Sequence, residues 1–578
     1  MLAQMRFHNT YICCMKLLAK LQHKPFFVAL LTNAVALVLG LILAGWRYVS
    51  MDDFFMHSVL TGAYGGKYDI HLYFVNAVYG VFLWPFYKIL PDVGWYSLFE
   101  KVTEFCSFVA ISYVVLRKYG GKLGGIITVL IVSCVALDFF LYVEFTRCAA
   151  VATAAGIFLF AVGHGEKRFS YLLWGTLFLV VGYVFRKEMF LLGLPTLVSV
   201  LFFSALLKKS IWKGTVIAVA VLAAALFGVK TFDQSLYKSG GYEYYAAYQG
   251  SRAFFGDGAF YDFKDFSDEL EELGRGSRDA RYLQAWYFYD NDVFSLDSIN
   301  NLIKIAQRSA YEPNYLKFPF AVARCISESL MTGYVWCWLL LCFTIVYFSN
   351  KKNWWVPWVS LAIIALSYTY LLLVNRVVPH VEAGIWIFAV IFALSFFDKH
   401  AIIEANQSKG FIKIFLLVSL VGLANTITLY EFGKTSRLLK AGYSTQSDWG
   451  AFLDYANRNS NDVFLLPFGR YKELGGFVGK TYKAVAPGSW NNIHSTGYWN
   501  IHLPPMEREL EKRGVTNLFR DIKNDNVFVL NDKQSLSFVP FYKEHYHEDL
   551  AVDTVRTFGN LFLLKYRVKE LTNETETP

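Results

Sequence analysis

The sequence predicts a polytopic α-helical membrane protein that ends in a soluble α/β domain. Of the 578 residues, 55% are hydrophobic and 18% are aromatic, a composition outside the range of an ordinary soluble domain. Apolar stretches long enough to cross the hydrocarbon core as helices recur through the first three quarters of the chain. The expected transmembrane helices number about eleven and cover residues 26–45, 99–116, 123–141, 148–163, 170–185, 189–207, 214–231, 331–349, 354–374, 380–397 and 411–430.

The first span is expected to remain as a helix with a cytoplasmic amino terminus. Its apolar run is too long for a cleaved signal peptide, and no cleavage pattern of small residues follows it. Basic residues precede the span, and positive charge stays on the cytoplasmic side. These residues are Arg6, Lys16, Lys20 and Lys24.

The charges of the short loops decide one ambiguous stretch, residues 72–90. If this stretch does not cross, every basic short loop falls on the cytoplasmic side, so we expect it to be interfacial or re-entrant. A first outer loop (46–98) and a long outer loop (232–330) then lie outside the cytoplasm. The predicted domains are therefore a transmembrane domain, 1–430, and an extracytoplasmic α/β domain, 431–578.

The carboxyl-terminal region alternates strand and helix patterns. Strand-like runs at 463–466, 527–530 and 561–564 alternate with helical patterns at 447–458 and 505–513, as in a small α/β domain. Its loop 488–499 mixes aromatic with amide and hydroxyl side chains, which suits either stacking on a sugar or burial in the domain. Residues 572–578 are expected to be disordered.

Charge and cysteine content exclude two classes of function. The net charge of +9 comes mostly from the cytoplasmic ends of the spans, so a nucleic-acid partner is not expected. The eight cysteines lie almost all within or beside apolar spans, and their spacing fits neither a disulfide framework nor a zinc site.

Asp52 and Asp53 follow the first span, where the chain leaves the membrane. Adjacent carboxylates at a membrane surface repel each other and need a compensating cation, metal or proton. One of them is a candidate general base for an acceptor hydroxyl, and the pair is a candidate site for an optional divalent ion, Mg²⁺ or Mn²⁺. The alternative is a solvated pair or the cap of a helix at 54–60.

Other ionisable residues occur at the same outer ends of the spans, where charge is costly and often functional. Arginine presents two parallel donors to phosphate oxygens, so such a cluster favours a phosphodiester ligand at the bilayer surface. The alternative for each residue is a charge that only extends to the headgroup level. The candidate substrate-binding residues are Glu144, Arg147, Arg186, Lys187, Glu188, Arg376 and His380, together with Asp69 and His71, which follow a glycine turn in the first loop.

With these residues in view, the chain resembles the GT-C class of membrane glycosyltransferases. Members take a sugar from a polyprenyl-phosphate carrier, and they combine many helices with an acidic first outer loop, interfacial helices and often a soluble carboxyl-terminal domain. Glu144-Phe145-Thr146-Arg147 is similar to the Glu-x-x-Arg-like pattern of the aminoarabinose and mannosyl transferase branches, and residues 375–380 resemble the stretch that opens a late helix. Residues 52–96 are also similar to bacterial membrane proteins associated with surface polysaccharides.

The resemblance implies an inverting glycosyl transfer in which Asp52 or Asp53 is the base. The expected partners are a polyprenyl-phosphate-linked sugar, a glycan or lipid-linked acceptor and membrane lipid, and the expected location is the plasma (inner) membrane. A second hypothesis is a lipid-linked polysaccharide polymerase or O-antigen ligase, which depends on long-loop arginines such as Arg275, Arg278 and Arg281. A third is a transporter or flippase, which predicts polar groups near the bilayer midplane.

Overall fold

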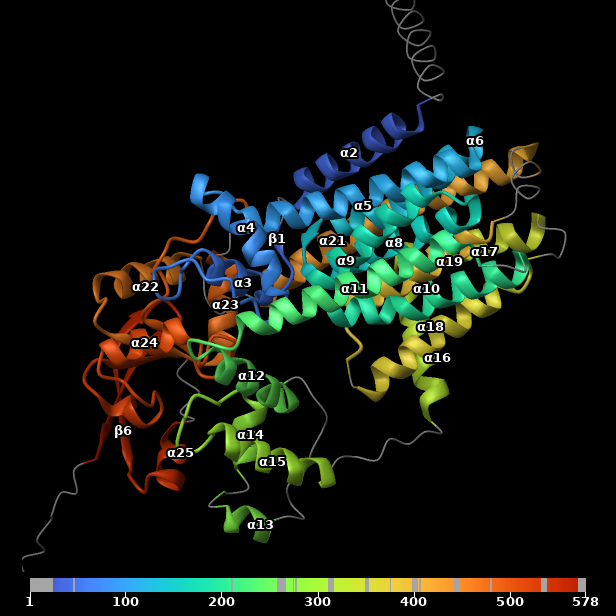
Figure 1. Cartoon of the computed structure of the whole chain (residues 1–578). Helices are drawn as coiled ribbons and strands as arrows, with labels where there is room; N and C mark the ends of the chain where they lie inside the picture. The colour runs from blue at the N-terminus through green and yellow to red at the C-terminus, as the bar shows by residue number, and fades with distance from the viewer. Residues whose placement is uncertain are drawn as a thin grey trace, which may run out of the picture.

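The computed structural model of the chain is a helical bundle that carries a mixed α/β domain at one end (Figure 1). It describes residues 24–44, 47–208, 211–256, 267–273, 275, 278–309, 317–348, 353–374, 376–397, 404, 407–440, 446–478, 481–531 and 538–569. The carboxyl-terminal tail 572–578 and the basic residues before Lys24 lie outside the described residues.

Apolar helices form the bundle. Within the described residues, seven helical segments are long and apolar enough to cross a membrane, or eight if one bent pair counts as a span. The seven are α2 (Pro25–Ala44), the run of α6 (Gly121–Ile131), η1 (Val132–Ala136) and α7 (Leu137–Phe140), α8 (Phe145–Glu166), α10 (Lys187–Lys208), α11 (Lys213–Leu236), α18 (Val356–Leu373) and α21 (Lys409–Lys440). A polytopic membrane protein is confirmed, and eleven crossings stay a prediction.

The other predicted spans are helical but depart from that length or composition. The bent pair, α16 (Phe318–Ser329) and α17 (Gly333–Phe348), meets at 99°. Two helices are apolar but shorter, α9 (Phe169–Phe185) and α19 (Pro379–Ser395). The remaining one, α5 (Trp95–Tyr119), is 25 residues long and carries several charges.

Helix α8 is the centre of the bundle. Each of its residues from Phe145 to His164 is buried, and it packs against α5, α9, α10 and α19. Small residues allow this close approach. A Cβ atom at Gly156 would lie 2.6 Å from Leu179 Cγ of α9, and one at Gly182 of α9 would lie 2.2 Å from Thr153 Oγ1.

The first loop folds over the end of the bundle that also carries the α/β domain, which we refer to as the outer end (Figure 1). It contains β1 (Arg47–Tyr48), α3 (Met51–Leu60) and α4 (Ala77–Ile89). Strand β1 pairs in parallel with β2 (Tyr142–Val143), which directly precedes α8. The ambiguous stretch 72–90 thus forms a helix of 13 residues, too short to cross a bilayer.

The long loop contributes four further helices near the α/β domain: α12 (Tyr242–Gly256), α13 (Ser267–Glu272), α14 (Asp279–Gln284) and α15 (Leu296–Ser309). Helix α12 is anchored to that domain by Gln249, which donates to the Ile501 carbonyl at 2.6 Å.

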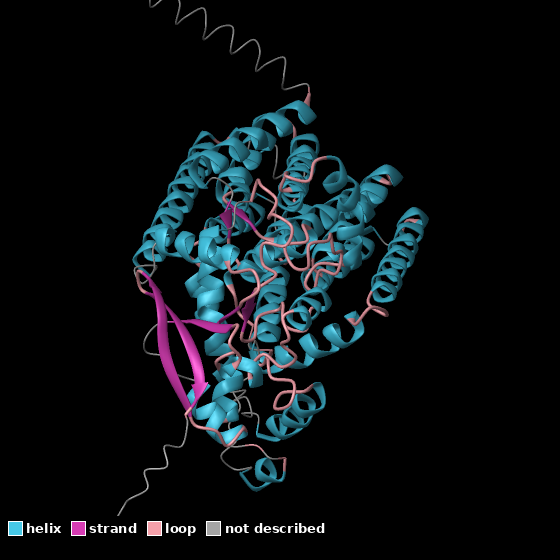
Figure 2. Ribbon diagram, turned by 90° about the vertical axis from the view of Figure 1, so that its left-hand side faces the viewer, coloured by secondary structure: helices cyan, strands magenta, loops and turns pink. Residues whose placement is uncertain are grey.

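The carboxyl-terminal region is a mixed α/β domain, as predicted. Its five strands lie in the order β4-β3-β5-β7-β6, with β4, β3 and β5 parallel and the last two antiparallel. Figure 2 shows the long β6–β7 hairpin at the margin of the molecule. The elements are α22 (Gln446–Arg458), β3 (Val463–Leu466), α23 (Phe468–Val478), β4 (Ile493–Ser495), α24 (Pro504–Lys512), η4 (Arg520–Lys523), β5 (Val527–Asn531), α25 (Phe538–His545), β6 (Leu550–Phe558) and β7 (Leu561–Val568).

Backbone hydrogen bonds attach this domain to the first loop. Ala484 N donates to the Asp92 carbonyl at 2.9 Å, and Gly94 N donates to the Tyr482 carbonyl at 3.1 Å. A Cβ atom at Gly94 would lie 2.1 Å from the Thr481 carbonyl oxygen, so this approach requires glycine. Segment 481–484 therefore lies directly against the turn that precedes α5.

Candidate functional site

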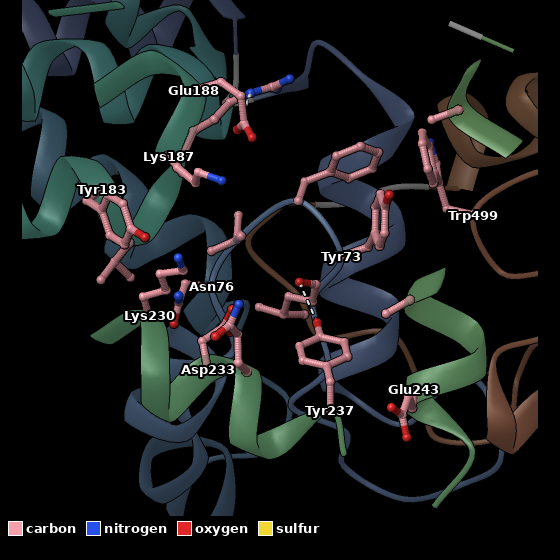
Figure 3. Close-up of a pocket in the computed structure, with 18 of the residues that line it drawn as sticks. Tyr73, Asn76, Tyr183, Lys187, Glu188, Lys230, Asp233, Tyr237, Glu243 and Trp499 are labelled. Carbon is pink, nitrogen blue, oxygen red and sulfur yellow. Dashed lines mark hydrogen bonds and ion pairs between the residues drawn. The ribbon is translucent and has the colours of Figure 1, made fainter. Parts of the chain in front are cut away.

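A cavity of about 740 Å³, which we call the outer cleft, opens at the outer end of the bundle (Figure 3). The first loop, the α9–α10 junction, the end of α11, helix α12 and the α/β domain all contribute to it. Its lining includes Leu72, Tyr73, Phe74, Asn76, Tyr183, Arg186, Lys187, Glu188, Lys230, Asp233, Tyr237, Lys238, Glu243, Arg376 and Trp499.

One side of the outer cleft is basic. Arg186 lies where α9 ends, in an extended conformation, and α10 begins at the next residue, Lys187. Arg186 Nη1 donates to Thr146 Oγ1 at 2.7 Å, and its guanidinium lies 4.9 Å from the Phe145 ring centroid. Lys187 and Lys230 are exposed, and neither makes an ion pair with another described residue. Together with Arg376, these side chains form the basic pole of the cleft.

Three carboxylates line the same cleft: Glu188, Asp233 and Glu243. Asp233 Oδ1 accepts a hydrogen bond from Ala77 N at 2.8 Å, so Asp233 holds the first turn of α4 while Asn76 caps it. In Figure 3 the Asp233 carboxyl lies beside Asn76 and Lys230. One oxygen of Asp233 is therefore fixed, on the wall between the basic pole and the first loop.

Aromatic rings form the opposite wall. Trp499 stacks on Tyr73 with ring centroids 4.7 Å apart and meets Phe74 edge to face at 4.4 Å. The guanidinium of Arg252, which is fully buried, lies 4.0 Å from the Trp499 ring. Trp499 is 3% exposed, so it stiffens this wall, while the partly exposed Tyr73 and Phe74 face the cavity.

The structure places Asp52 and Asp53 outside the lining of the outer cleft. Asp52 is half-buried and accepts a hydrogen bond from Tyr498 of the α/β domain at 2.8 Å. Asp53 is fully buried and accepts from Tyr96 at 2.9 Å and from Phe145 N at 3.3 Å. Burial, followed by the nearby Glu144 carboxylate, raises the pKa of Asp53 well above its usual value.

Asp53 is nevertheless linked to the wall of the cleft through Phe145, whose backbone N–H donates to it. Its partner Phe145 presents its ring to Arg186 and stacks on Phe74 at 5.8 Å, and both of those residues line the cavity. Asp53 thereby holds the backbone that positions part of the basic pole.

Glu144 and Arg147 belong to the same support. The Glu144 carboxylate accepts from Arg147 N at 2.7 Å and caps α8. Arg147 Nη1 pairs with Asp138 at 2.9 Å, and Tyr334 donates to that same carboxylate at 3.0 Å. His380, at the start of α19, lies within electrostatic range of Glu144, Arg147, Arg186 and Arg376. The charges that precede α8 and those at the start of α19 therefore gather around the first turn of α8.

Asp69 and His71 are outside the lining of the cleft and lie behind Tyr237, whose ring meets the His71 ring at 5.1 Å. His71 Nδ1 lies 2.6 Å from Asp69 Oδ1, and His71 Nε2 lies 3.1 Å from the Leu236 carbonyl at the end of α11. Tyr242 of α12 donates to the other Asp69 oxygen. The pair joins the first loop to the two elements that flank Tyr237.

Three charged residues of α5 had not been predicted from the sequence as part of the support. Glu100, Lys101 and Glu104 are almost completely buried, and Lys101 pairs with Glu104 at 2.6 Å and donates to the Phe139 carbonyl. Two carboxylates and an amine within five residues of an otherwise apolar helix were the signal that could have identified them.

The long-loop arginines lie elsewhere. Arg275 donates to Ser298 at 2.8 Å, Arg278 lies 3.9 Å from Glu544, and neither these nor Arg281 lines the outer cleft. Long-loop residues reach the cleft from residues 233–238, at the end of α11, and from α12.

Within the described part of the chain, one group of three side chains offers ligand atoms close enough to share an ion: Asp279, Glu544 and His545. Asp52 and Asp53 are not part of it. His545 Nε2 and Asp279 Oδ1 lie 2.8 Å apart, and Arg278 Nη1 lies 3.9 Å from Glu544.

Comparison with known proteins returned no family for this chain: no family model, no curated protein and no solved structure matches it.

Proposed function

We propose that this protein is a membrane glycosyltransferase that transfers a sugar from a polyprenyl-phosphate donor bound in the outer cleft. The observation that carries the proposal is the composition of the cleft: five basic side chains, three carboxylates and a rigid aromatic wall share one cavity at the ends of membrane-spanning helices. The basic side chains can bind a phosphate, a carboxylate can accept a proton, and the aromatic wall can stack on a sugar.

The basic pole suits the phosphodiester of the donor. Arg186 donates from Nη1 to Thr146, and its Nε lies 4.0 Å from Glu188 Oε2, beyond hydrogen-bond distance. Its Nε and Nη2 can therefore turn to a phosphate oxygen in this proposal. Lys187 and Lys230 add positive charge to this pole, and neither makes an ion pair with a described residue. Charge that develops on the leaving phosphate is stabilised by these cations.

Apolar surface lies directly beside the basic pole. Leu191 is one turn from Lys187 on α10 and is 45% exposed, and Phe227 is about one turn from Lys230 on α11 and is 72% exposed. A prenyl chain lies along these side chains while its phosphate reaches the lysines. This pairing of lipid-facing and cationic residues favours a lipid-linked donor over a soluble one.

Asp233 is the cleft carboxylate best placed to act as general base. Its Oδ1 is fixed by Ala77 N, which leaves Oδ2 to accept the proton of an acceptor hydroxyl. The acceptor oxygen then forms a bond to the anomeric carbon, the bond from that carbon to the phosphate oxygen breaks, and the prenyl phosphate leaves with the electron pair. In this proposal Asp52 and Asp53 position the wall, while the sequence-based hypothesis makes one of them the base.

The acceptor is a glycan or a lipid-linked molecule outside the cytoplasm, and the protein is placed in the plasma membrane with its α/β domain outside. A divalent ion is optional, because phosphate is a good leaving group once Arg186 and the neighbouring lysines stabilise its negative charge.

Transfer can be measured with the purified protein in nanodiscs, a panel of polyprenyl-phosphate sugars and lipid-linked glycan acceptors, with mass spectrometry of the product. We expect Asp233→Asn to lose about 10²–10⁴-fold in rate while still binding prenyl phosphate. Asp297→Asn, an exposed change on α15, is the matched control. If Asp233→Asn keeps full activity and Asp53→Asn loses it, the general base is Asp53 of the first loop, as the sequence-based hypothesis has it. No product with any donor, together with measured lipid or solute transport, supports the transporter hypothesis.

A further inference from the structure

We infer that a second groove, between α4 and the α/β domain, binds the headgroup of an anionic phospholipid of the surrounding leaflet. The groove has a volume of about 380 Å³. It is lined by Thr61, Gly66, Tyr68, Trp84, Tyr87, Lys88, Pro91, Asp92 and the segment 483–487. This inference does not rest on the proposed transferase activity.

Two parts of the first loop form the sides of the groove, and the α/β domain forms its base. Ala484 N is bonded to the Asp92 carbonyl on one side, and Gly488 N is bonded to the Gly62 carbonyl on the other at 2.8 Å. The segment between these bonds therefore spans the groove at a fixed depth. A ligand in the groove touches α4 and the α/β domain at once.

The groove carries more positive than negative charge. Lys88 Nζ lies 3.9 Å from the Trp84 ring centroid, one turn earlier on α4, so the ring holds the amine at the groove. Lys483 enters from the α/β domain. Both lysines are exposed, and neither makes an ion pair with a described residue, while Asp92 is the carboxylate of the lining. Two amines against one carboxylate suit a phosphodiester of charge −1.

The surface next to the groove is suited to acyl chains. Helix α4 and the residue after it expose Val81 (40%), Phe82 (49%), Ile89 (75%) and Leu90 (52%). A short helix with exposed apolar side chains, tryptophan and lysine is typical of a segment that lies at the membrane interface. Because apolar surface adjoins the charged groove, a phospholipid fits it better than free phosphate or a soluble glycan.

A lipid held between Lys88 and Lys483 connects the membrane to the α/β domain. Since Lys483 lies in the segment bonded to the loop before α5, the headgroup reinforces the attachment that Gly94 makes through the backbone. The groove thereby favours one placement of the α/β domain over the bundle.

Native mass spectrometry of the full chain tests the inference, with phosphatidylglycerol and phosphatidylcholine of equal chain length. We expect Lys88→Gln/Lys483→Gln to weaken phosphatidylglycerol binding about thirtyfold and to leave phosphatidylcholine binding unchanged. The control, Lys472→Gln/Lys569→Gln, removes the same charge from exposed positions outside the groove. Thermal unfolding in detergent without anionic lipid verifies that both variants are folded.

Three outcomes overturn the inference: equal phosphatidylglycerol affinity in the groove and control variants, no preference of the wild type for phosphatidylglycerol over phosphatidylcholine, or displacement of the lipid by glycerophosphate or a soluble glycan at the same concentration. The first shows that the lysines are not the site. The other two show that the ligand is not an anionic lipid.

Discussion

Arg186→Lys is the substitution that most sharply tests how the outer cleft holds a phosphate. The change keeps the positive charge but removes the planar fork. In the structure one Arg186 nitrogen is committed to Thr146 at 2.7 Å, and the Phe145 ring at 4.9 Å fixes the plane of the guanidinium. The remaining nitrogens supply two parallel donors to a phosphate, whereas lysine supplies a single point charge.

The magnitude follows from the lost hydrogen bond. A hydrogen bond to a charged group contributes about 1.5–3 kcal/mol, so losing one weakens binding about tenfold to a hundredfold. Arg186→Ala loses the charge as well and is expected to bind more weakly still.

Binding of a short-chain prenyl phosphate is measured through tryptophan fluorescence, because Trp499 lines the cleft. Lys472→Ala, a change at an exposed position of the α/β domain, is the control. If Arg186→Lys and Arg186→Ala both bind like the wild type, Arg186 is not a phosphate ligand and the basic pole has been assigned incorrectly.

Three further predictions concern the support of the cleft and the α/β domain. Gly94→Ala is expected to destabilise the attachment of that domain by about 1–3 kcal/mol, because its Cβ would lie 2.1 Å from a backbone oxygen; thermal unfolding should show this loss, and Gly450→Ala, which meets no neighbour, should show none. Burial raises the pKa of Asp53 above its unfolded-state value of about 4, so the wild type should lose stability as the pH rises from about 4 through the folded-state pKa. The free energy of unfolding of Asp53→Asn should therefore rise relative to that of the wild type over this range. A difference between the two that stays constant from pH 4 to 9 would contradict the burial. Burial lowers the pKa of His494 to about 3, below its unfolded-state value of about 6.5, so acidification below pH 6.5 destabilises the folded protein by about 2 kcal/mol at pH 5. His494→Gln should lose less stability on acidification by that amount. Equal loss in the variant and the wild type would contradict the burial of a neutral imidazole.

Much of the fold could be predicted because its signals are strong and local. Long apolar runs identified the bundle, and strands β3, β5 and β7 were predicted from runs of apolar residues at 463–466, 527–530 and 561–564. Strand β4 has three residues, and β6 mixes apolar with polar residues and is largely exposed, so neither shows a hydrophobic period. Their pairing with distant strands, which a local pattern does not contain, determines them.

The candidate site was predictable in part. Arg186, Lys187, Glu188 and Arg376 were selected because charges at span ends are costly, and the structure brings them into one cavity. Asp233 satisfied the same criterion two residues beyond the predicted end of its span, 214–231. Tyr73 and Trp499 are 426 residues apart, and their stacking depends on how the α/β domain lies against the first loop.

The burial of Asp53 also has a tertiary cause. Adjacent aspartates after a span suggest solvent exposure, but Tyr96 of α5 and the first turn of α8 close over this one. A neighbouring position, Asp52, faces the α/β domain instead. Contacts between distant segments therefore determine which of the two carboxylates is buried.

The most direct test of the central claim is a cryo-electron microscopy structure of the protein in nanodiscs with a polyprenyl-phosphonate sugar that cannot be cleaved. We predict the phosphonate within hydrogen-bond distance of Arg186, the prenyl chain along α10 and α11, and the sugar between Asp233 and the aromatic wall. Density for the phosphonate away from the outer cleft, or an empty cleft at saturating ligand, would contradict the proposal.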